Sequence, residues 1–208
     1  MDLLKIFVQR FFLPRKQRLS LKEMEYQKER RPLPVLRGGV QENGMPSIRL
    51  AKAVNQQCGK ISYKYDAFNG LQDRYTHPEH LQWMIETGKY DKTFAGADCD
   101  ETANYAICLF HKAGVDDKHL FELNMVVGIL SQITQAKYNH VLCGFNLTDS
   151  TGVLWTGVID TNSAGKDIFW SKGTVEEATP QILQHFKELY SAKYYALIQP
   201  LKKLQELL

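Results

Sequence analysis

The stretch FAGADCDETANYAICLF, residues 94–110, decides the fold that we expect for this chain. Asp98 followed three residues later by Glu101 is a capping-box pattern, which predicts that a helix starts with Cys99 at its first position. The apolar residues after it recur on one helical face, and Gly114 ends the pattern. The stretch therefore predicts a central core helix with a cysteine at its N-terminal end.

The first position of a helix alters the chemistry of a cysteine. Unpaired backbone N–H groups and the positive end of the helix dipole favour the thiolate there, and such cysteines can be strongly nucleophilic. The nearby carboxylates oppose this effect; they are Asp98, Asp100 and Glu101. We therefore expect Cys99 to act as a nucleophile only if a histidine from elsewhere in the chain is brought to it.

Strand patterns follow this helix. Residues 121–130, 138–147 and 154–161 are rich in β-branched and aromatic residues. The TDSTG turn signal between the last two predicts an antiparallel hairpin. His140 near the start of one strand and Asp160 near the end of the next should then lie close together. A carboxylate beside a histidine fixes its tautomer, so the sequence predicts a Cys99-His140-Asp160 triad.

Length and charge predict one compact domain with an appendage. A chain of 208 residues with 44% apolar content can bury one substantial core. Residues 1–60 hold 13 Lys/Arg and 5 Asp/Glu, so the positive charge gathers there. We expect a basic N-terminal arm and linker in residues 1–46. The compact domain should span residues 47–208, opening at Ser47 as an N-cap.

The arm contains an amphipathic basic pattern. Its apolar residues recur at helical spacing up to Pro14, a capping box opens a second helix at Ser20, and residues 31–47 read as a linker. The first helix should dock on the body, on a partner chain or on a membrane surface, and we expect a protein partner. Nucleic-acid binding is not expected, because the aromatic residues are not interleaved with the basic ones.

No signal peptide or transmembrane helix is expected either. Lys5 and Arg10 interrupt the first apolar run, and no cleavage site follows. The compartment stays undecided between the cytoplasm and an assembled particle. The chain end, from Thr174 through Leu189 and past Pro200, is predicted to form one or two helices.

The four cysteines show no C-x-x-C pair, which argues against a zinc ribbon or a disulfide framework. Cys108 and Cys143 lie among apolar neighbours and should be small buried hydrophobes. His77 and His80 have a spacing that metal ligands can have, but a helix start is favoured. We expect no metal and no cofactor.

The motifs GADCDETANYAICLFHKAGV, NHVLCGF and W-x-x-x-x-D-T, in that order, resemble the transglutaminase-like superfamily, especially its bacterial cysteine proteinases. The resemblance covers roughly residues 76–165. It implies an α+β, papain-like fold in which a central helix packs on an antiparallel sheet. By it, Cys99 is the nucleophile, His140 the general base and then acid, and Asp160 the orienting group.

This chain departs from the family pattern at two places. Ala97 stands where the family usually has glycine, and the acidic pair Asp100-Glu101 is in reversed order. The Cys99 backbone N–H is one natural oxyanion donor. Gln82, Trp83 and Asp98 are positional candidates for an oxyanion-binding or substrate-positioning role.

The resemblance implies a thiol hydrolase that cleaves a peptide or isopeptide bond in a protein or peptide substrate. Acyl transfer to an amine, as in a crosslinking transglutaminase, would use the same residues. A peptidoglycan peptidase of the NlpC type is a rival, although its usual Ser-Gly after the cysteine is missing. From a different class, the chain could be a structural or accessory component of a larger assembly such as a phage virion, held by its arm.

Overall fold

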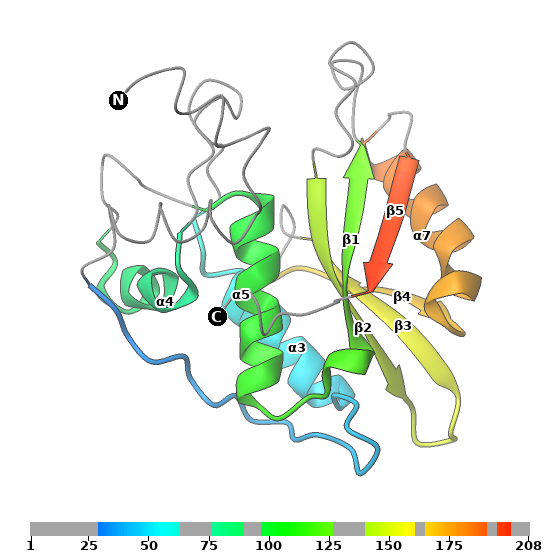
Figure 1. The fold of residues 1–208 in the computed structure, drawn as a ribbon, viewed down its shortest axis with the longest axis horizontal. Helices are drawn as coiled ribbons and strands as arrows, with labels where there is room; N and C mark the ends of the chain where they lie inside the picture. Colours follow the sequence, from blue (N-terminus) through cyan, green and yellow to red (C-terminus); the bar gives the residue numbers. More distant parts are fainter. Residues whose placement is uncertain are drawn as a thin grey trace.

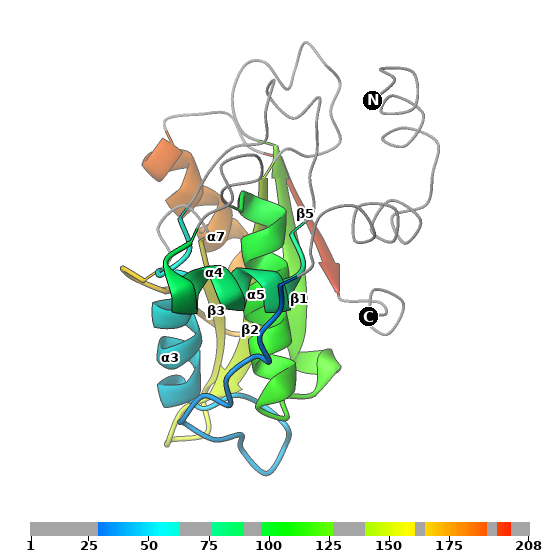
Figure 2. The same cartoon turned by 90° about the vertical axis from the view of Figure 1, so that its left-hand side faces the viewer.

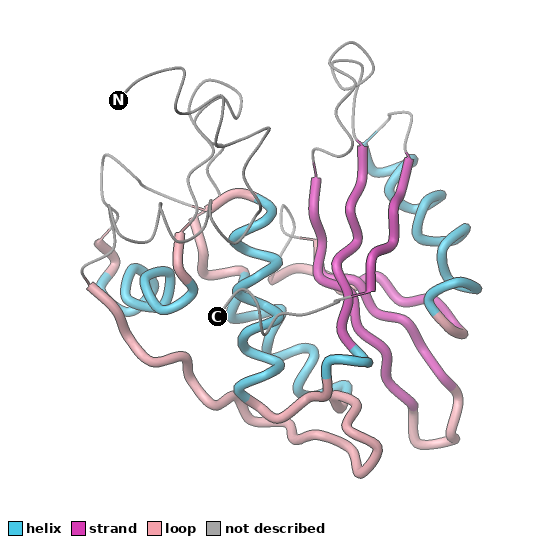
Figure 3. Tube along the Cα trace, viewed as in Figure 1, coloured by secondary structure: helices cyan, strands magenta, loops and turns pink. Residues whose placement is uncertain are grey.

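The computed structural model describes residues 29–62, 76–89, 97–126, 140–160, 165–190 and 195–200. Within them, helices pack on both faces of one antiparallel sheet, so the fold is α+β, as the sequence predicts (Figures 1 and 3). The helices predicted within residues 1–28 lie outside the described residues.

Among the described residues, the sheet has five strands in the order β4-β3-β2-β1-β5, and every neighbouring pair is antiparallel. The predicted hairpin is formed by β2 and β3. Its turn is closed by the Asp149 carboxylate, which accepts hydrogen bonds from the backbone N–H groups of Thr151 and Val153. The strands are β1 (Leu120–Val126), β2 (His140–Thr148), β3 (Leu154–Ile159), β4 (Phe169–Lys172) and β5 (Tyr195–Pro200).

The C-terminal part differs from the sequence prediction. Helix α7 (Val175–Tyr190) is present, and Thr174 and Glu177 cap it reciprocally. Residues 195–200, predicted to be helical, form β5 and pair with β1. The helix prediction is therefore wrong for this segment. The apolar run in residues 195–200 is too short to distinguish the periodicity of a helix from that of a strand. Pairing with the edge of β1 decides the conformation of this segment.

In the described part of the chain, three helices cover one face of the sheet. They are α3 (Ile48–Cys58), α4 (Pro78–Thr87) and α5 (Cys99–Lys112). Helix α5 contacts β2 and is flanked by α3 and α4, as Figure 2 shows from the helical side. Helix α7 covers the other face, and the short 3-10 helix η1 (Asp117–His119) leads from α5 into β1.

Helix α5 is the central helix that the opening stretch predicts. It begins at Cys99 after the N-cap Asp98, and Glu101 contributes to a capping box. Eleven of its 14 residues are buried, so the helix lies inside the protein rather than on its surface. The chain then leaves the helix through Gly114, whose φ of 93° favours glycine.

The alternation of side chains along the strands divides the apolar interior into two parts. On β2, Val141 and Cys143 face α5 and join the larger cluster, in which Phe145 packs on Phe110 with ring centroids 5.1 Å apart. Leu142 faces the other way and packs with Val158 of β3 and with α7. Cys108 and Cys143 are buried, which confirms the prediction for both. The sheet thus holds β2 rigidly between two layers of helices.

Residues 29–46 run along the compact body. The backbone N–H of Arg31 donates to the Glu79 carbonyl at 2.9 Å, and Gln41 donates to the Thr148 carbonyl at 2.8 Å. Apolar side chains of this segment pack on the larger cluster; they are Leu33, Leu36 and Val40. The domain boundary at residue 46 stays a prediction, but these contacts give the described part of the arm a stabilising role.

A pair of truncations tests that role. A protein spanning residues 29–208 should be more stable than one spanning residues 47–208 by about 2–4 kcal/mol. The second lacks three partly buried apolar side chains and the hydrogen bonds that Arg31 and Gln41 make to the body. Urea unfolding of both proteins measures the difference. Equal midpoints and slopes would show that residues 29–46 are a mere linker, as the sequence alone suggests.

Candidate active site

Cys99 lies at the junction of α5 and β2. It is the first residue of the helix and is 8% exposed. The backbone N–H of Val141 donates a hydrogen bond to its sulfur. Since Val141 directly follows His140, this bond ties the cysteine to the start of the strand that carries the predicted base.

His140 and Asp160 lie beside each other. His140 Nε2 is 3.2 Å from Asp160 Oδ1, and the two residues are 5% and 4% exposed. The hairpin register, in which Cys143 faces Ile159, places Asp160 diagonally across the ladder from His140. The predicted adjacency is therefore present. Because Nε2 faces the carboxylate, Nδ1 is the ring nitrogen that could take a proton from a thiol.

Glu101 fixes the start of α5 in place. Its two carboxylate oxygens accept hydrogen bonds from different backbone N–H groups, one from Asp98 and one from Thr76, each at 3.1 Å. The residue is 1% exposed. Thr76 precedes α4, so this carboxylate joins the beginnings of two helices and holds Cys99 where the helix begins.

The surroundings of Cys99 disfavour its thiolate. Burial raises the pKa of the Cys99 thiol well above its usual range, and the charges of Asp100 and Asp98 raise it further. A carboxylate oxygen of each aspartate lies within 4.8 Å of the sulfur. The hydrogen bond from Val141 acts in the opposite direction but does not outweigh these effects. The thiol is therefore protonated at rest, and the thiolate-favouring effect expected of the helix end does not prevail.

The thiols of the other three cysteines should react little with thiol reagents. Cys58, Cys108 and Cys143 are all buried and none is in a disulfide. Burial raises the pKa of each thiol, that of Cys108 to about 12. Thiol reagents should therefore distinguish Cys99 if a base assists it.

Gln82 and Trp83, the positional candidates for an oxyanion donor, are engaged elsewhere. The Gln82 amide oxygen accepts hydrogen bonds from Tyr105 at 2.5 Å and from Gln57 at 3.2 Å, and its nitrogen donates to Glu86 at 2.7 Å. Trp83 stacks on His80, with ring centroids 5.2 Å apart. The role of Gln82 or Trp83 in binding an oxyanion stays a prediction. The network of Gln82 joins α3, α4 and α5.

Asp98 and Asp100 flank the sulfur, and with Cys99 they are the one group of three close potential metal ligands in the described parts of the chain. Three consecutive residues provide only part of a coordination sphere. The buried oxygen Oδ1 of Asp98 has no hydrogen-bond partner among the described residues. The positional role predicted for Asp98 in substrate binding stays a prediction.

Two buried polar residues on β1 are not among the site residues that the sequence predicts. Glu122 and Asn124 lie on the face of the strand that is turned toward α5, opposite Cys143 and Val141 respectively. The signal that could have found them is the period-two spacing of two polar residues within an apolar strand. Asn124 is thus a strand neighbour of the residue that donates to the Cys99 sulfur.

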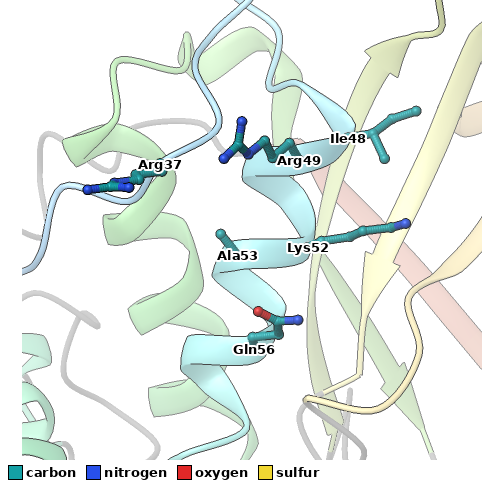
Figure 4. Close-up of a pocket in the computed structure, with 6 residues that line it drawn as sticks. All are labelled: Arg37, Ile48, Arg49, Lys52, Ala53 and Gln56. Carbon is teal, nitrogen blue, oxygen red and sulfur yellow. The ribbon is translucent and has the colours of Figure 1, made fainter.

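An open depression of about 590 Å³ lies beside α3 and away from the proposed triad. Figure 4 shows the Arg49 guanidinium on the side of α3 toward Arg37, with Lys52 extending away from both. None of the lining residues is a predicted site residue; they are Arg37, Ile48, Arg49, Lys52, Ala53 and Gln56. We therefore do not assign this depression to the substrate.

No family model matches the sequence, and no curated protein matches it. Two solved structures are similar, Legionella pneumophila LapG and its EGTA-treated form. Each is 14% identical with a TM-score of 0.38, and the matches cover 82% and 85% of this chain and 76% of each LapG chain. A likeness at this TM-score does not decide the family.

The helices within the described residues are too short or too polar to cross a membrane.

Proposed function

We propose that the protein is a thiol hydrolase that cleaves a peptide or isopeptide bond, built as a transglutaminase-like cysteine peptidase with a papain-like core. One observation carries the proposal: the Cys99 sulfur is bound by Val141 N–H, directly beside His140, whose Nε2 is 3.2 Å from Asp160. These contacts support the proposal that His140, held by Asp160, reaches the Cys99 thiol from the neighbouring residue of β2.

The acylation step assigns one role to each side chain. His140 Nδ1 takes the proton of the Cys99 thiol as the sulfur attacks the substrate carbonyl carbon, and Asp160 stabilises the imidazolium that forms. In this proposal the backbone N–H of Cys99, at the first position of α5, stabilises the oxyanion. His140 then donates the proton to the leaving amine as the C–N bond breaks, which leaves a thioester on Cys99.

The deacylation step reverses these proton transfers. A water molecule gives a proton to His140 and attacks the thioester carbonyl, and the carboxylic acid leaves as the Cys99 sulfur regains its proton. An amine in place of water would give acyl transfer with the same residues. The raised pKa of Cys99 supports general-base assistance at the moment of attack rather than a resting thiolate.

Alkylation of Cys99 by iodoacetamide, located by mass spectrometry, tests the proposal. At pH 7 the His140→Ala variant should react at least about tenfold more slowly than the wild type, because no base then assists a thiol whose pKa is raised. The difference should persist at pH about 8.5, the ordinary thiol pKa, and shrink only as the pH approaches the raised pKa of the Cys99 thiol, where the thiol ionises without help.

His185 provides the matched control. It lies on α7, on the other side of the sheet, and stacks on Phe169 with ring centroids 4.3 Å apart. His185→Ala should leave the alkylation profile unchanged. Superimposable profiles for the wild type and His140→Ala would refute a catalytic role for the pair.

A second candidate function is an accessory role in a larger assembly, which the surface around α3 favours. Arg37, Arg49 and Lys52 are exposed and have no acidic partner among the described residues, and Ile48 beside them is 42% exposed. An unpaired basic surface next to an exposed apolar side chain suits a protein partner with an acidic contact surface. A protein that is inactive at Cys99 yet associates through this surface would fit this candidate.

A further inference from the structure

Asn124 on β1 is a buried polar residue that the proposed mechanism does not use. It is 2% exposed, and its amide oxygen Oδ1 has no hydrogen-bond partner among the residues that the structure describes. An unpaired buried acceptor destabilises a fold by about 1–3 kcal/mol, and native proteins contain few of them. A polar side chain retained in this way suggests that a ligand completes its hydrogen bonding.

The strand register places Asn124 next to the proposed site. Asn124 is directly opposite Val141, and Met125 is opposite His140. Residues opposite each other in an antiparallel pair have Cα atoms about 4.5–5.5 Å apart, and their side chains project to the same face. Val141 belongs to the apolar cluster with α5, and its N–H donates to the Cys99 sulfur. Asn124 therefore projects toward the end of α5 that carries the cysteine.

The neighbouring pair confirms which face Asn124 occupies. Leu123 and Leu142, the next pair along the ladder, both belong to the cluster under α7. Since successive side chains alternate between faces, Asn124 and Val141 must lie on the α5 face. The assignment therefore rests on two adjacent pairs of residues and not on one contact.

We propose that Asn124 Oδ1 accepts a hydrogen bond from an amide N–H of the substrate beside the reacting carbonyl. The proposed site would then be selective for amides, as in peptide and isopeptide bonds, over esters of the same shape. This inference rests on the proposed function, because it requires that a carbonyl compound is bound at Cys99.

The chemistry of an amide matches the unpaired atom. A substrate amide that enters a water-poor site needs an acceptor for its N–H, and Asn124 Oδ1 needs a donor, so each satisfies the other. An ester has no N–H and would leave Oδ1 unpaired. Sites built to hydrogen-bond a particular group reject analogues that lack it. A selectivity of about tenfold corresponds to a single neutral hydrogen bond.

Two small thiol reagents test the selectivity without knowledge of the natural substrate. Iodoacetamide carries an amide N–H beside its carbonyl, and methyl iodoacetate is a neutral ester of similar shape. For the full-length protein, the alkylation rate of Cys99 by each reagent is divided by that of free cysteine. The ratio of the two normalised rates should be about tenfold lower in Asn124→Leu than in the wild type.

Two further variants separate the hydrogen bond from a loss of packing. Asn124→Asp keeps acceptor oxygens at this position, so its ratio should stay within about threefold of the wild type even if its added charge slows both reactions. Glu122→Gln changes the adjacent polar residue of the same face and should leave the ratio unchanged. Circular dichroism confirms folding, and Asn124→Ala replaces Asn124→Leu if the latter does not fold.

The outcomes distinguish this inference from the proposed function. Equal ratios in the wild type, Asn124→Leu and Asn124→Ala would overturn the amide contact. If His140→Ala leaves both rates unchanged while the ratio still falls in Asn124→Leu, the proposed catalytic function fails and the amide contact stands. If His140→Ala slows both reagents equally and the ratio falls, both proposals are supported.

Discussion

Replacing Asp160 with asparagine should slow the acylation of Cys99 by 4-nitrophenyl acetate about 10²- to 10⁴-fold at neutral pH. Asp160 is buried, and its Oδ1 is 3.2 Å from His140 Nε2. The carboxylate keeps the proton on Nε2, which leaves Nδ1 able to accept one. An amide NH₂ group would instead donate to Nε2, so the ring proton would move to Nδ1 and block the base. Stopped-flow release of 4-nitrophenolate measures the rate.

The folded structure should change little in this variant, because asparagine has the shape of aspartate. Asp167, an exposed aspartate in the loop before β4, gives a control of the same chemistry, and Asp167→Asn should acylate at the wild-type rate. Thermal melts of both variants close to that of the wild type would exclude unfolding as the cause. An Asp160→Asn rate within threefold of the wild type would argue that His140 does not act through this carboxylate.

The steps of this chemistry depend on one arrangement of elements. The hairpin of β2 and β3 carries His140 and Asp160 together, and the Val141 N–H joins the start of the hairpin to α5. Because β2 is packed between helices on both faces, the position of the strand relative to α5 is restrained. The layers of the fold therefore act as a frame for the proposed triad.

The sequence predicts the parts of this frame that local signals specify. The capping box at Asp98 and Glu101 places the start of α5, and the TDSTG turn places the hairpin, because both patterns depend on residues within one turn. The adjacency of His140 and Asp160 follows from the hairpin alone. The triad's catalytic role is a different matter and stays a proposal.

Features that depend on distant partners could not be read from the sequence. The hydrogen bonds that the Gln82 amide oxygen accepts from Tyr105, 23 residues away, and from Gln57 depend on how three helices pack together. The strand β5 exists because the edge of β1 receives it. The sign of the Cys99 pKa shift depends on burial, which the sequence does not give. In each instance tertiary packing outweighs the local pattern.

Glu101 is the residue whose replacement should destabilise the proposed site region most. Glu101→Ala should reduce the free energy of unfolding by about 2–4 kcal/mol, because it removes the acceptor of the buried Thr76 N–H and of the half-buried Asp98 N–H. Glu101→Gln retains one acceptor oxygen and should lose about half as much. Urea unfolding monitored by circular dichroism measures both.

The exposed Glu176 is the matched control, because it too is an acidic residue in the first turn of a helix, α7. Glu176→Ala removes the same charge from the same kind of position, but it breaks no hydrogen bond that joins two elements. It should therefore change stability by no more than about 0.5–1 kcal/mol.

A Glu101→Ala variant as stable as Glu176→Ala would mean that the buried carboxylate serves only as an ordinary helix cap. A large loss for Glu101 with a small loss for Glu176 would instead show that joining the starts of α4 and α5 is what holds Cys99 in position. If the two variants are equally stable, the placement of Cys99 must depend on the Val141 hydrogen bond and on the packing of α5 alone.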